Sequence, residues 1–260
     1  MPKIFDNIEN HLVRALNQTL EVSHRSDFCV GYFNLRGWKE VADHIDKWEG
    51  DKNNRCRLLI GMQRLPTDLI RDFFSLKADE MMDNKAAIEI RKQLAEEFKE
   101  QLTIGIHTDA DEIGLRKLAK QIKDKKVVVK LYLRHPLHAK LYLLFRDDKI
   151  NPIIGFLGSS NLTLSGLSKQ GELNIDVMDH DAAEKLEKWF EDRWNDRWCI
   201  DISAELAEII DTSWAGDRLL SPYYIYLKMA YHLSQEAIAG ITQFKLPKEF
   251  EAQLFEIQKK

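Results

Sequence analysis

Short apolar runs and longer amphipathic stretches alternate along the first third of the chain. Residues 27–33, DFCVGYF, and residues 56–62, CRLLIGM, are apolar runs of strand length, and residues 37–50 between them have the spacing of a helix. A strand, a helix and a second strand in so short a stretch favour a βαβ unit. We therefore expect these two strands to pair in parallel.

The pattern continues with a long helical middle and then returns to strands. Residues 66–126 are rich in good helix formers, with dense mixed charge that is typical of a solvated face. The other elements that the pattern predicts are helices at residues 4–22, 79–102, 111–126 and 181–198, and strands at residues 126–133, 138–145, 151–158 and 172–179.

This order of elements predicts an α/β fold with a mixed, largely parallel β-sheet flanked by helices. After residue 179 we expect no further strand. Residues 201–260 are expected to be a helical appendage, in which Ser221 is the N-cap of a helix and Pro222 its first residue. We divide the chain accordingly into a domain at residues 1–200 and a connector at residues 201–260.

Composition and charge narrow the possible classes of protein. The chain has 260 residues, of which 44% are apolar and 31% charged, an ordinary balance for a globular protein. It has neither an apolar run of the ~20 residues that span a membrane nor an N-terminal signal peptide, so we expect a cytoplasmic protein without a membrane partner. The net charge of −4 offers no broad basic surface, and any contact with nucleic acid must come from a local patch, a partner or further sequence.

The three cysteines are too widely spaced to indicate chemistry. Cys29, Cys56 and Cys199 form no disulfide framework and no paired metal-ligand spacing. We expect buried free thiols and no metal site.

His138 and Lys140 stand two residues apart in the otherwise apolar segment LRHPLHAKLYLLF, residues 133–145. Because successive side chains of a strand point to opposite faces, a strand over residues 138–145 places His138, Lys140 and Tyr142 on one face. An isolated ammonium is costly to bury, so Lys140 must meet an anion or reach solvent. By itself the pair also fits a strand end that emerges into water.

A small polar loop follows the next expected strand, in GFLGSSNLTLSGL at residues 155–167. Its backbone N–H groups and short donors suit an oxyanion such as phosphate. Glu172, at the start of the following strand, can accept a hydrogen bond from a histidine Nδ1–H, which would fix the tautomer and leave Nε2 free to attack. The residues expected to bind phosphate are Lys140, Ser159, Ser160, Asn161 and Thr163.

Three separated pieces of the chain, His138-x-Lys140, Gly158-Ser159-x-Asn161 and Glu172, together resemble the motif of the phospholipase D superfamily, the HKD family. The resemblance is to its bacterial nuclease-like branch in particular. It implies a phospholipase D-like α/β/α sandwich with His138, Lys140, Asn161 and Glu172 as catalytic residues. Members of this family cleave phosphodiesters through a covalent phosphohistidine and use no metal or other cofactor, since lysine charge takes the place of the metal.

The chain departs from the family pattern at one position. The aspartate that usually follows the histidine by seven residues is replaced by Phe145, with Asp147 and Asp148 just beyond it. That aspartate supports the reacting groups, so its replacement puts full activity in question.

The family uses two such motifs that face each other across a two-fold or pseudo-two-fold axis. This chain has one, because none of its other histidines has a lysine two residues on. We therefore expect a homodimer that shares one active site, in which one His138 attacks phosphorus and the other protonates the leaving oxygen. His135 is expected to be a loop histidine, within possible reach of substrate.

The end of the chain resembles a connector to a motor domain. Residues 221–231, SPYYIYLKMAY, and residues 250–260, FEAQLFEIQKK, are similar to the segment that joins such a domain to a Swi/Snf-type superfamily 2 helicase in some bacterial proteins. Gln258 would be the glutamine that contacts adenine. The resemblance implies that an ATP-binding helicase follows in a longer polypeptide, since the motif Gly-x-x-x-x-Gly-Lys-Ser/Thr does not occur in these residues. DNA is then the expected substrate in preference to RNA.

Two other functions stay open. A catalytically silent domain could use the phosphate pocket to hold DNA, or serve only to dimerise a helicase, and Phe145 and the net charge of −4 are compatible with it. A phospholipase is the other enzyme class, against which stand the missing signal peptide, the lack of an apolar lid and the single motif. The sequence decides neither the strandedness of the substrate, nor sequence specificity, nor the biological pathway.

Overall fold

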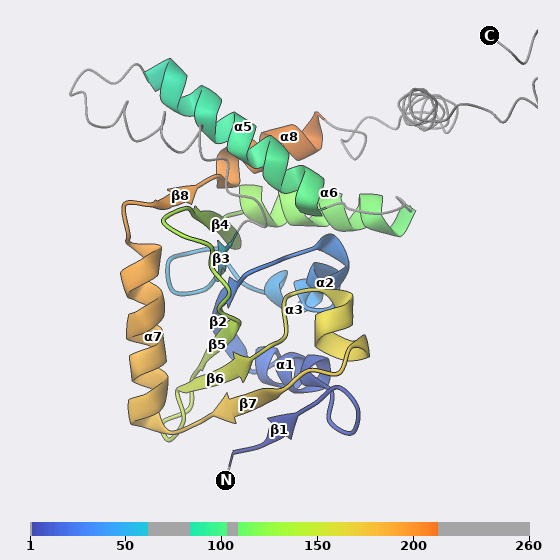
Figure 1. Cartoon of the computed structure of the whole chain (residues 1–260), viewed down its shortest axis with the longest axis vertical. Coiled ribbons are helices and arrows are strands. Elements are labelled where there is room, and N and C mark those ends of the chain that lie inside the picture. Colours follow the sequence, from blue (N-terminus) through green and yellow to red (C-terminus); the bar gives the residue numbers. More distant parts are fainter. Residues whose placement is uncertain (1, 62–83, 103–108, 213–260) are drawn as a thin grey trace, which may run out of the picture. The chain divides into compact units, whose positions relative to one another are not determined.

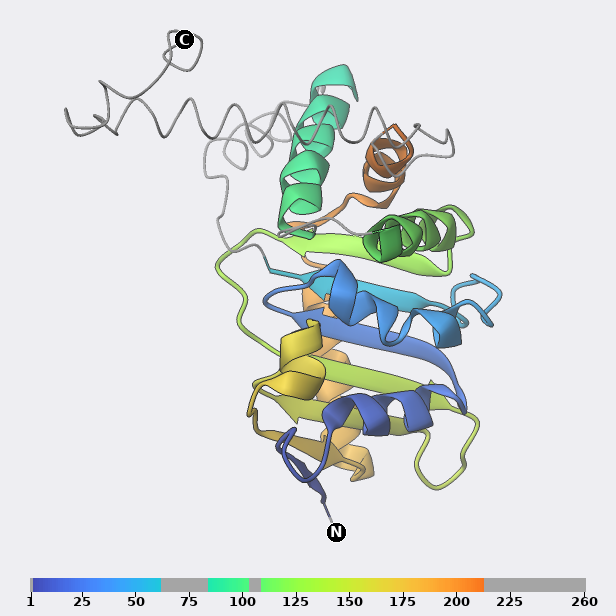
Figure 2. The same cartoon turned by 90° about the vertical axis from the view of Figure 1, so that its right-hand side faces the viewer.

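The computed structural model of the chain describes residues 2–61, 84–102 and 109–212, which all belong to one compact unit, Met1–Asp217. Within these residues an eight-stranded sheet lies between helices on both faces, as Figures 1 and 2 show. The strand order is β1-β7-β6-β5-β2-β3-β4-β8. The strands are β1 (Ile4–Phe5), β2 (Ser23–Val30), β3 (Cys56–Ile60), β4 (Val127–Tyr132), β5 (Leu141–Arg146), β6 (Ile153–Gly158), β7 (Asn174–Val177) and β8 (Cys199–Asp201).

The pairing confirms a mixed sheet and the expected βαβ unit, but it corrects the proportion of parallel pairs. β2 pairs in parallel with β3, and β3 with β4, whereas the five other neighbouring pairs are antiparallel. The expectation of a largely parallel sheet is therefore wrong. The reason is that β5, β6 and β7 follow one another through connections that reverse the chain, and such connections join antiparallel strands.

Of the helices in the described residues, α7 lies on one face of the sheet, while α1, α2, α3 and α6 lie on the other (Figures 1 and 2). Their bounds are α1 (Leu12–Leu20), α2 (Leu35–Lys39), α3 (Ala42–Ile45), α5 (Asn84–Leu102), α6 (Asp109–Lys123), α7 (His180–Trp194) and α8 (Ser203–Asp211). A five-residue π-helix, Ser165–Lys169, follows the polar loop after β6.

Several helix boundaries differ from the expected ones. The helix expected at residues 4–22 begins at Leu12, because the chain before it forms β1, and the helix expected at residues 37–50 is the pair α2 and α3. Asn34 caps α2 by accepting a hydrogen bond from the N–H of Gly37 at 2.9 Å. The edge strands β1 and β8, of two and three residues, were not expected and are too short to show a periodicity.

Each face of the sheet carries its own apolar core. On one face, the α1 leucines Leu12, Leu16 and Leu20 follow the i, i+4, i+8 spacing of a helix and are buried. On the other face, Phe190 and Trp194 of α7 stack on each other at 5.6 Å between ring centroids and are buried. Trp194 is thus part of the core on the α7 face.

A buried ion-pair network joins α7 to the sheet. Asp27 on β2 is fully buried and accepts two hydrogen bonds from the guanidinium of Arg57 on β3, at 2.6 and 2.7 Å. Arg25 contacts the same carboxylate at 2.6 Å, and Arg57 also reaches Glu191 of α7 at 2.5 Å. Charges this deep are tolerated because each one is paired and hydrogen-bonded.

The three cysteines are free. Cys29 and Cys56 are buried, as expected, and Cys199 is half-buried. Burial raises the pKa of the Cys29 thiol to about 12, which removes its reactivity at neutral pH.

Part of the expected organisation lies outside the described residues. The helix expected after Ser221 and the helicase-like position Gln258 belong there, and the division at residue 200 stays a prediction. None of the described helices has both the length and the apolar character that a membrane span requires.

Candidate active site

Five strands bring the separated sequence motifs to one edge of the sheet. The carboxyl ends of β2 and β3 lie beside the start of β5, since Cys29 pairs with Leu141. The end of β6 lies beside the start of β5, because Leu157 pairs with Leu141. The start of β7 lies beside the end of β6, because Asn174 pairs with Gly158. The segments that carry the predicted site residues therefore converge at this edge.

The histidine and the lysine lie in a crossover, residues 133–140, and not in a strand. β5 begins at Leu141, three residues later than expected, because the chain leaves β4 and must first pass the ends of β3 and β2. His138 is exposed and Lys140 is half-buried. Both positions thus reach solvent at the edge of the sheet.

Two glycines allow the crossover to lie directly on the strand ends. Gly31 follows β2 and Gly61 follows β3, and a Cβ at either would stand 2.7 or 2.6 Å from the carbonyl oxygen of Leu137. The same Cβ on Gly31 would lie 3.4 Å from the Cα of His138. The position of His138 is therefore set by close packing of main chain on main chain.

The alternation expected for this segment holds where it is a strand. Ala139, Leu141 and Leu143 pack on the α7 side, and Tyr142 packs on the opposite side. The Tyr142 hydroxyl donates to the carbonyl oxygen of Ser160 at 2.8 Å. Complete burial, with a smaller contribution from the nearby Glu172 charge, raises the pKa of Tyr142 well above its usual value, so this phenol stays protonated.

Lys140 turns its ammonium back toward the crossover. Its Nζ donates to the carbonyl oxygen of His138 at 2.6 Å. This contact holds the cation beside the histidine, and the half-exposed side chain keeps donors that an anion can use.

Asn161 is fixed from the neighbouring strand. Its Oδ1 accepts a hydrogen bond from the backbone N–H of Tyr32 at 2.9 Å. A Cβ on Gly31 would lie 3.6 Å from this same oxygen, so Gly31 packs close to both Asn161 and His138. The structure thus brings Asn161 and His138 together around the end of β2.

Glu172 has a different partner from the expected one. Its carboxylate accepts a hydrogen bond from the Ser159 hydroxyl, and that hydroxyl in turn accepts one from the N–H of Leu173 at 2.9 Å. Within the described part of the chain the His138 imidazole has no hydrogen-bond partner. The expected contact between Glu172 and a histidine is therefore not formed in this single chain.

Ser160 and Thr163 hold the polar loop in place. Ser160 is fully buried; its N–H donates to Oδ1 of Asn174 at 3.2 Å, and its Oγ accepts from Nδ2 of Asn174 at 2.8 Å. Thr163 is also buried, and its Oγ1 accepts from the N–H of Gly166 at 2.9 Å. Both hydroxyls are already engaged, so these residues shape the loop from within, whereas Ser159 is exposed at its surface.

The position of the missing family aspartate is far from this edge. Phe145 lies near the other end of β5, buried in the α7-side core, with the guanidinium of Arg25 4.0 Å from its ring centroid. Asp147 and Asp148 follow in the turn after β5, where Asp147 faces His24 at 3.6 Å and Asp148 faces Arg146 at 3.1 Å. Neither aspartate takes the place of the missing one.

Sequence reasoning missed the residues that position the site. Gly31 and Tyr32 hold His138 and Asn161, and Asn174 and Gly166 hold the loop. The sequence did contain a signal for Gly31, because the apolar runs DFCVG and CRLLIG both end in glycine. Glycine at such a place often marks a close approach of backbone.

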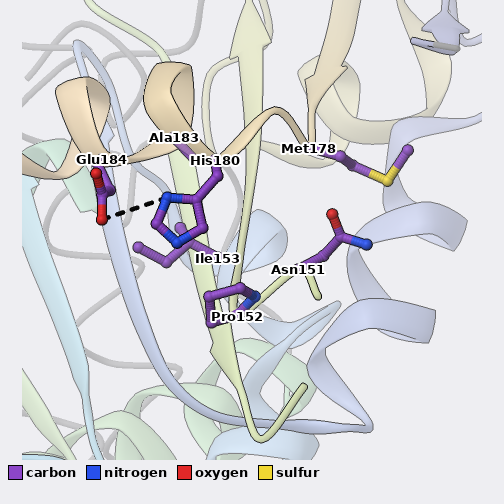
Figure 3. A pocket seen from close by; sticks show the side chains of 7 residues that line it. All are labelled: Asn151, Pro152, Ile153, Met178, His180, Ala183 and Glu184. Carbon is purple, nitrogen blue, oxygen red and sulfur yellow. Dashed lines mark ion pairs between the residues drawn. The ribbon is translucent and has the colours of Figure 1, made fainter. Parts of the chain in front are cut away.

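A hollow of about 180 Å³, open to solvent, lies at the opposite edge of the sheet (Figure 3). His180 and Glu184, one turn apart on α7, are part of its lining, with Nδ1 of His180 3.3 Å from Oε1 of Glu184. Its lining includes none of the predicted site residues. Among the described residues, no group of three or more His, Cys, Asp and Glu side chains has a metal-binding arrangement.

The mixed sheet with His138, Lys140, Asn161 and Glu172 at one edge defines a phospholipase D-like domain. The chain belongs to the phospholipase D-like family, since a family model described as cardiolipin synthase, PLD-like domain, matches residues 12–194. That match spans every predicted site residue. Members of this superfamily are phosphodiesterases.

Several solved structures are similar to the chain at low identity. The phospholipase D family member Nuc from Salmonella typhimurium has 12% identity and a TM-score of 0.43, covering 77% of this chain and 97% of Nuc. NucT from Helicobacter pylori has 11% identity and a TM-score of 0.44, covering 77% and 98%. Phosphatidylserine synthase from Haemophilus influenzae has 15% identity and a TM-score of 0.45, covering 91% and 46%. A search of curated proteins gave no match.

Proposed function

We propose that the chain is a metal-independent phosphodiesterase that cleaves DNA through a phosphohistidine. The observation that supports this most directly is the meeting of His138, Lys140 and Asn161 around the end of β2, where Gly31 packs close to both His138 and Asn161. A nucleophile, a cation and a neutral amide donor at one solvent-accessible edge suit an anionic diester.

In the proposed reaction, Nε2 of one His138 attacks phosphorus and the bond to the leaving oxygen breaks. That oxygen takes a proton from the imidazolium of a second His138, a contribution of roughly 10²–10⁴ in rate. Water then attacks phosphorus, the bond between phosphorus and Nε2 of the first His138 breaks, and the second imidazole, now neutral, accepts the proton that the water loses. Lys140 and Asn161 hold the nonbridging oxygens as charge builds on them.

The second His138 is proposed to come from a second copy of the chain. The sequence holds one His-x-Lys pair, and the reaction needs both an attacking imidazole and an imidazolium. Two identical histidines in opposite protonation states titrate as a coupled pair, so a pH profile would report the pair and not one residue.

DNA and a linked helicase are the most specific parts of the proposal. They rest on the resemblance of the C-terminal residues to a helicase connector, with Gln258 at its end, and that segment lies outside the described residues. A net charge of −4 requires that DNA contacts come from a limited part of the surface or from the linked domain.

A catalytically silent DNA-binding or dimerisation domain is the second candidate. It is favoured by Phe145, which places a buried ring where the family carries a supporting carboxylate. The hydrogen bond of Glu172 to Ser159 favours it as well, since it leaves His138 without an orienting carboxylate in the single chain. A phospholipase is not supported by any further feature of the site.

The test is cleavage of plasmid, oligonucleotide and bis-p-nitrophenyl phosphate in the presence of EDTA. We expect cleavage that resists EDTA and disappears in His138→Ala. His135→Ala is the matched control, because His135 is exposed on the same crossover and its loss should leave the cleavage of bis-p-nitrophenyl phosphate unchanged. If the unmutated protein binds DNA but cleaves none of the three substrates, the silent domain is the correct reading.

A further inference from the structure

Two cations near the crossover have uncharged hydrogen-bond partners. Lys140 donates to the carbonyl oxygen of His138, and Arg193 of α7 donates through Nη1 to the carbonyl oxygen of Trp189 at 3.0 Å. Within residues 2–61, 84–102 and 109–212, no carboxylate lies within ion-pair distance of either cation. A carbonyl oxygen has no net charge, so the positive charge of both side chains stays uncompensated. Lys140 belongs to the candidate active site, whereas Arg193 has no role there so far.

The helical spacing directs Arg193 toward the candidate active site. Phe190 and Trp194 of α7 face the sheet, and Glu191 lies on one flank of the helix, where it contacts Arg57. With about 3.6 residues per turn, Arg193 lies on the opposite flank. Arg57 is the second residue of β3, whereas the candidate site lies at the carboxyl ends of β2 and β3. Because α7 runs across the strands (Figures 1 and 2), its Arg193 flank faces these carboxyl ends.

Packing and charge both place Arg193 near the crossover. Ala139 of the crossover and Trp189 of α7 pack against the same apolar core. Burial raises the pKa of the Cys29 thiol in this core to about 12, and the charges of Arg193 and Lys140 both oppose the rise. Coulomb interactions weaken with distance, so the two cations lie near the same buried thiol.

Trp189 holds the guanidinium of Arg193 in a fixed place. The guanidinium carbon lies 3.6 Å from the centroid of the indole ring, within the range of a cation–π interaction. The hydrogen bond to the Trp189 carbonyl oxygen uses one N–H and leaves other donors of the guanidinium for a ligand. A planar donor group that is already held in place loses less conformational freedom when it binds an oxyanion.

The crossover itself favours an anion. Its residues 133–140, LRHPLHAK, include no aspartate or glutamate, and Arg134, His135 and His138 are exposed. Asp196 follows α7, and its carboxylate pairs with Arg134 at 3.0 Å, so its charge is compensated. An anionic ligand can therefore extend from His138 to Arg193 along a surface of donors.

We propose that Arg193 binds a second phosphate of the DNA strand whose scissile phosphate lies at His138 and Lys140. The inference rests on the proposed function, because it places a polynucleotide in the candidate active site. Every nucleotide of a strand brings a phosphate, and a strand held at Lys140 therefore brings a neighbouring phosphate toward α7. Arginine suits this ligand, since its donors match two oxygens of one phosphate. Such a site favours a polynucleotide over a diester with a single phosphate.

The test is the binding of a fluorescein-labelled single-stranded oligonucleotide to the full chain, measured by fluorescence anisotropy over a range of salt concentrations. His138→Ala serves as the background, so that the oligonucleotide is not cleaved. We expect Arg193→Gln to raise the dissociation constant about tenfold to a hundredfold. The slope of log K against log salt concentration should become shallower by about 0.7, the value for one lost phosphate contact with a single strand.

Lys188→Gln is the matched control. Lys188 is an exposed cation of the same helix, and the helical spacing directs it away from the sheet. Its substitution removes the same charge from the chain and should leave both the dissociation constant and the salt slope unchanged. If Arg193→Gln does not fold, Arg193→Met provides the same test, because its apolar side chain can still pack on the Trp189 ring.

Cleavage with His138 in place gives the second readout. Bis-p-nitrophenyl phosphate has a single phosphate, and the oligonucleotide has one for each linkage. Arg193→Gln should therefore raise KM for the oligonucleotide at least tenfold more than it raises KM for the small diester. Equal losses on the two substrates would overturn the inference, because Arg193 would then act on the reacting groups and not on a neighbouring phosphate.

The remaining outcomes separate the inference from the proposed function. If Arg193→Gln binds the oligonucleotide as tightly as Lys188→Gln and with the same salt slope, the second phosphate site is wrong and the diesterase is unaffected. If the unmutated chain cleaves bis-p-nitrophenyl phosphate but binds no oligonucleotide, the inference is wrong as well. If Arg193→Gln weakens binding and the unmutated chain cleaves no substrate, the phosphate site is supported and the enzyme is rejected.

Discussion

The side-chain oxygen of Asn161 accepts a hydrogen bond from the backbone N–H of Tyr32, at 2.9 Å. Because the oxygen is used in this way, the NH₂ group is the end of the amide that a phosphate oxygen can reach. The bond ties the polar loop after β6 to the end of β2, and in the proposed reaction the same side chain would also offer its NH₂ group to substrate.

Asn161→Asp separates these two roles. The carboxylate keeps an acceptor for Tyr32 but replaces the donor by a negative charge, which repels a phosphodiester. We expect kcat on bis-p-nitrophenyl phosphate to fall by about 10²–10³, the usual cost of losing one such donor. Urea unfolding should change by no more than about 1 kcal/mol. Full activity of this variant would remove Asn161 from the proposed site.

Gly31→Ala tests whether close backbone packing positions His138. The new methyl would stand 2.7 Å from the Leu137 oxygen and 3.4 Å from the His138 Cα, so the crossover must move away. We expect a loss of about 1–3 kcal/mol in the free energy of unfolding and a larger relative loss in kcat than in KM. Gly171→Ala is the control, as nothing lies within 4 Å of a Cβ there. Equal activity of both variants would contradict this account.

Ser159→Ala and Ser160→Ala should affect different properties of the protein, although both residues lie in the predicted phosphate loop. Ser160 is buried and bonded to Asn174, so its loss should cost about 1–3 kcal/mol in thermal or urea unfolding. Ser159 is exposed and bonded to Glu172, so its loss should leave unfolding nearly unchanged but alter the pH profile of cleavage. If only Ser159→Ala lost stability, Ser159 and not Ser160 would be the residue that holds the loop in place.

Glu191→Gln should destabilise the protein at neutral pH and much less in acid. Burial favours the neutral carboxyl of Glu191, but the hydrogen bond and charge of Arg57 outweigh it and lower its pKa below 4.5. A lowered pKa means that the charged form stabilises the fold above pH 4.5, and this contribution is lost as pH falls through the pKa of the folded state.

The difference in unfolding free energy between Glu191→Gln and the unmutated chain should be on the order of 1 kcal/mol at pH 7, since solvent screens this part-exposed pair. Denaturant titrations between pH 7 and pH 3 measure it. Asp192→Asn, at the exposed neighbouring position of α7, should show no comparable difference. A difference that grows in acid would show that the sign is wrong.

The sequence predicts the sheet best where the apolar pattern is long. The strand around Tyr142 could be predicted because five consecutive residues of β5 are apolar, and all five are buried. The βαβ unit could be predicted from the apolar runs DFCVGYF and CRLLIGM. β1 and β8 could not be predicted, because strands of two or three residues are too short to show an alternating pattern. The parallel proportion was wrong because the direction of β5, β6 and β7 depends on connection lengths and not on strand composition.

The candidate site was predictable in its members but not in its contacts. The resemblance to the phospholipase D motif grouped His138, Lys140, Asn161 and Glu172, yet it could not show that Glu172 bonds Ser159 or that Tyr32 holds Asn161. Such contacts depend on which side chain reaches furthest across neighbouring loops, and the local sequence does not encode this.

The passage of the crossover over Gly31 and Gly61 has a consequence for redesign. Where main chain rests on main chain, no change of side-chain rotamer can shift the backbone of His138 by a fraction of an ångström. Selection for bulkier diesters would then act on the surrounding loops and leave the backbone at the ends of β2 and β3 unchanged.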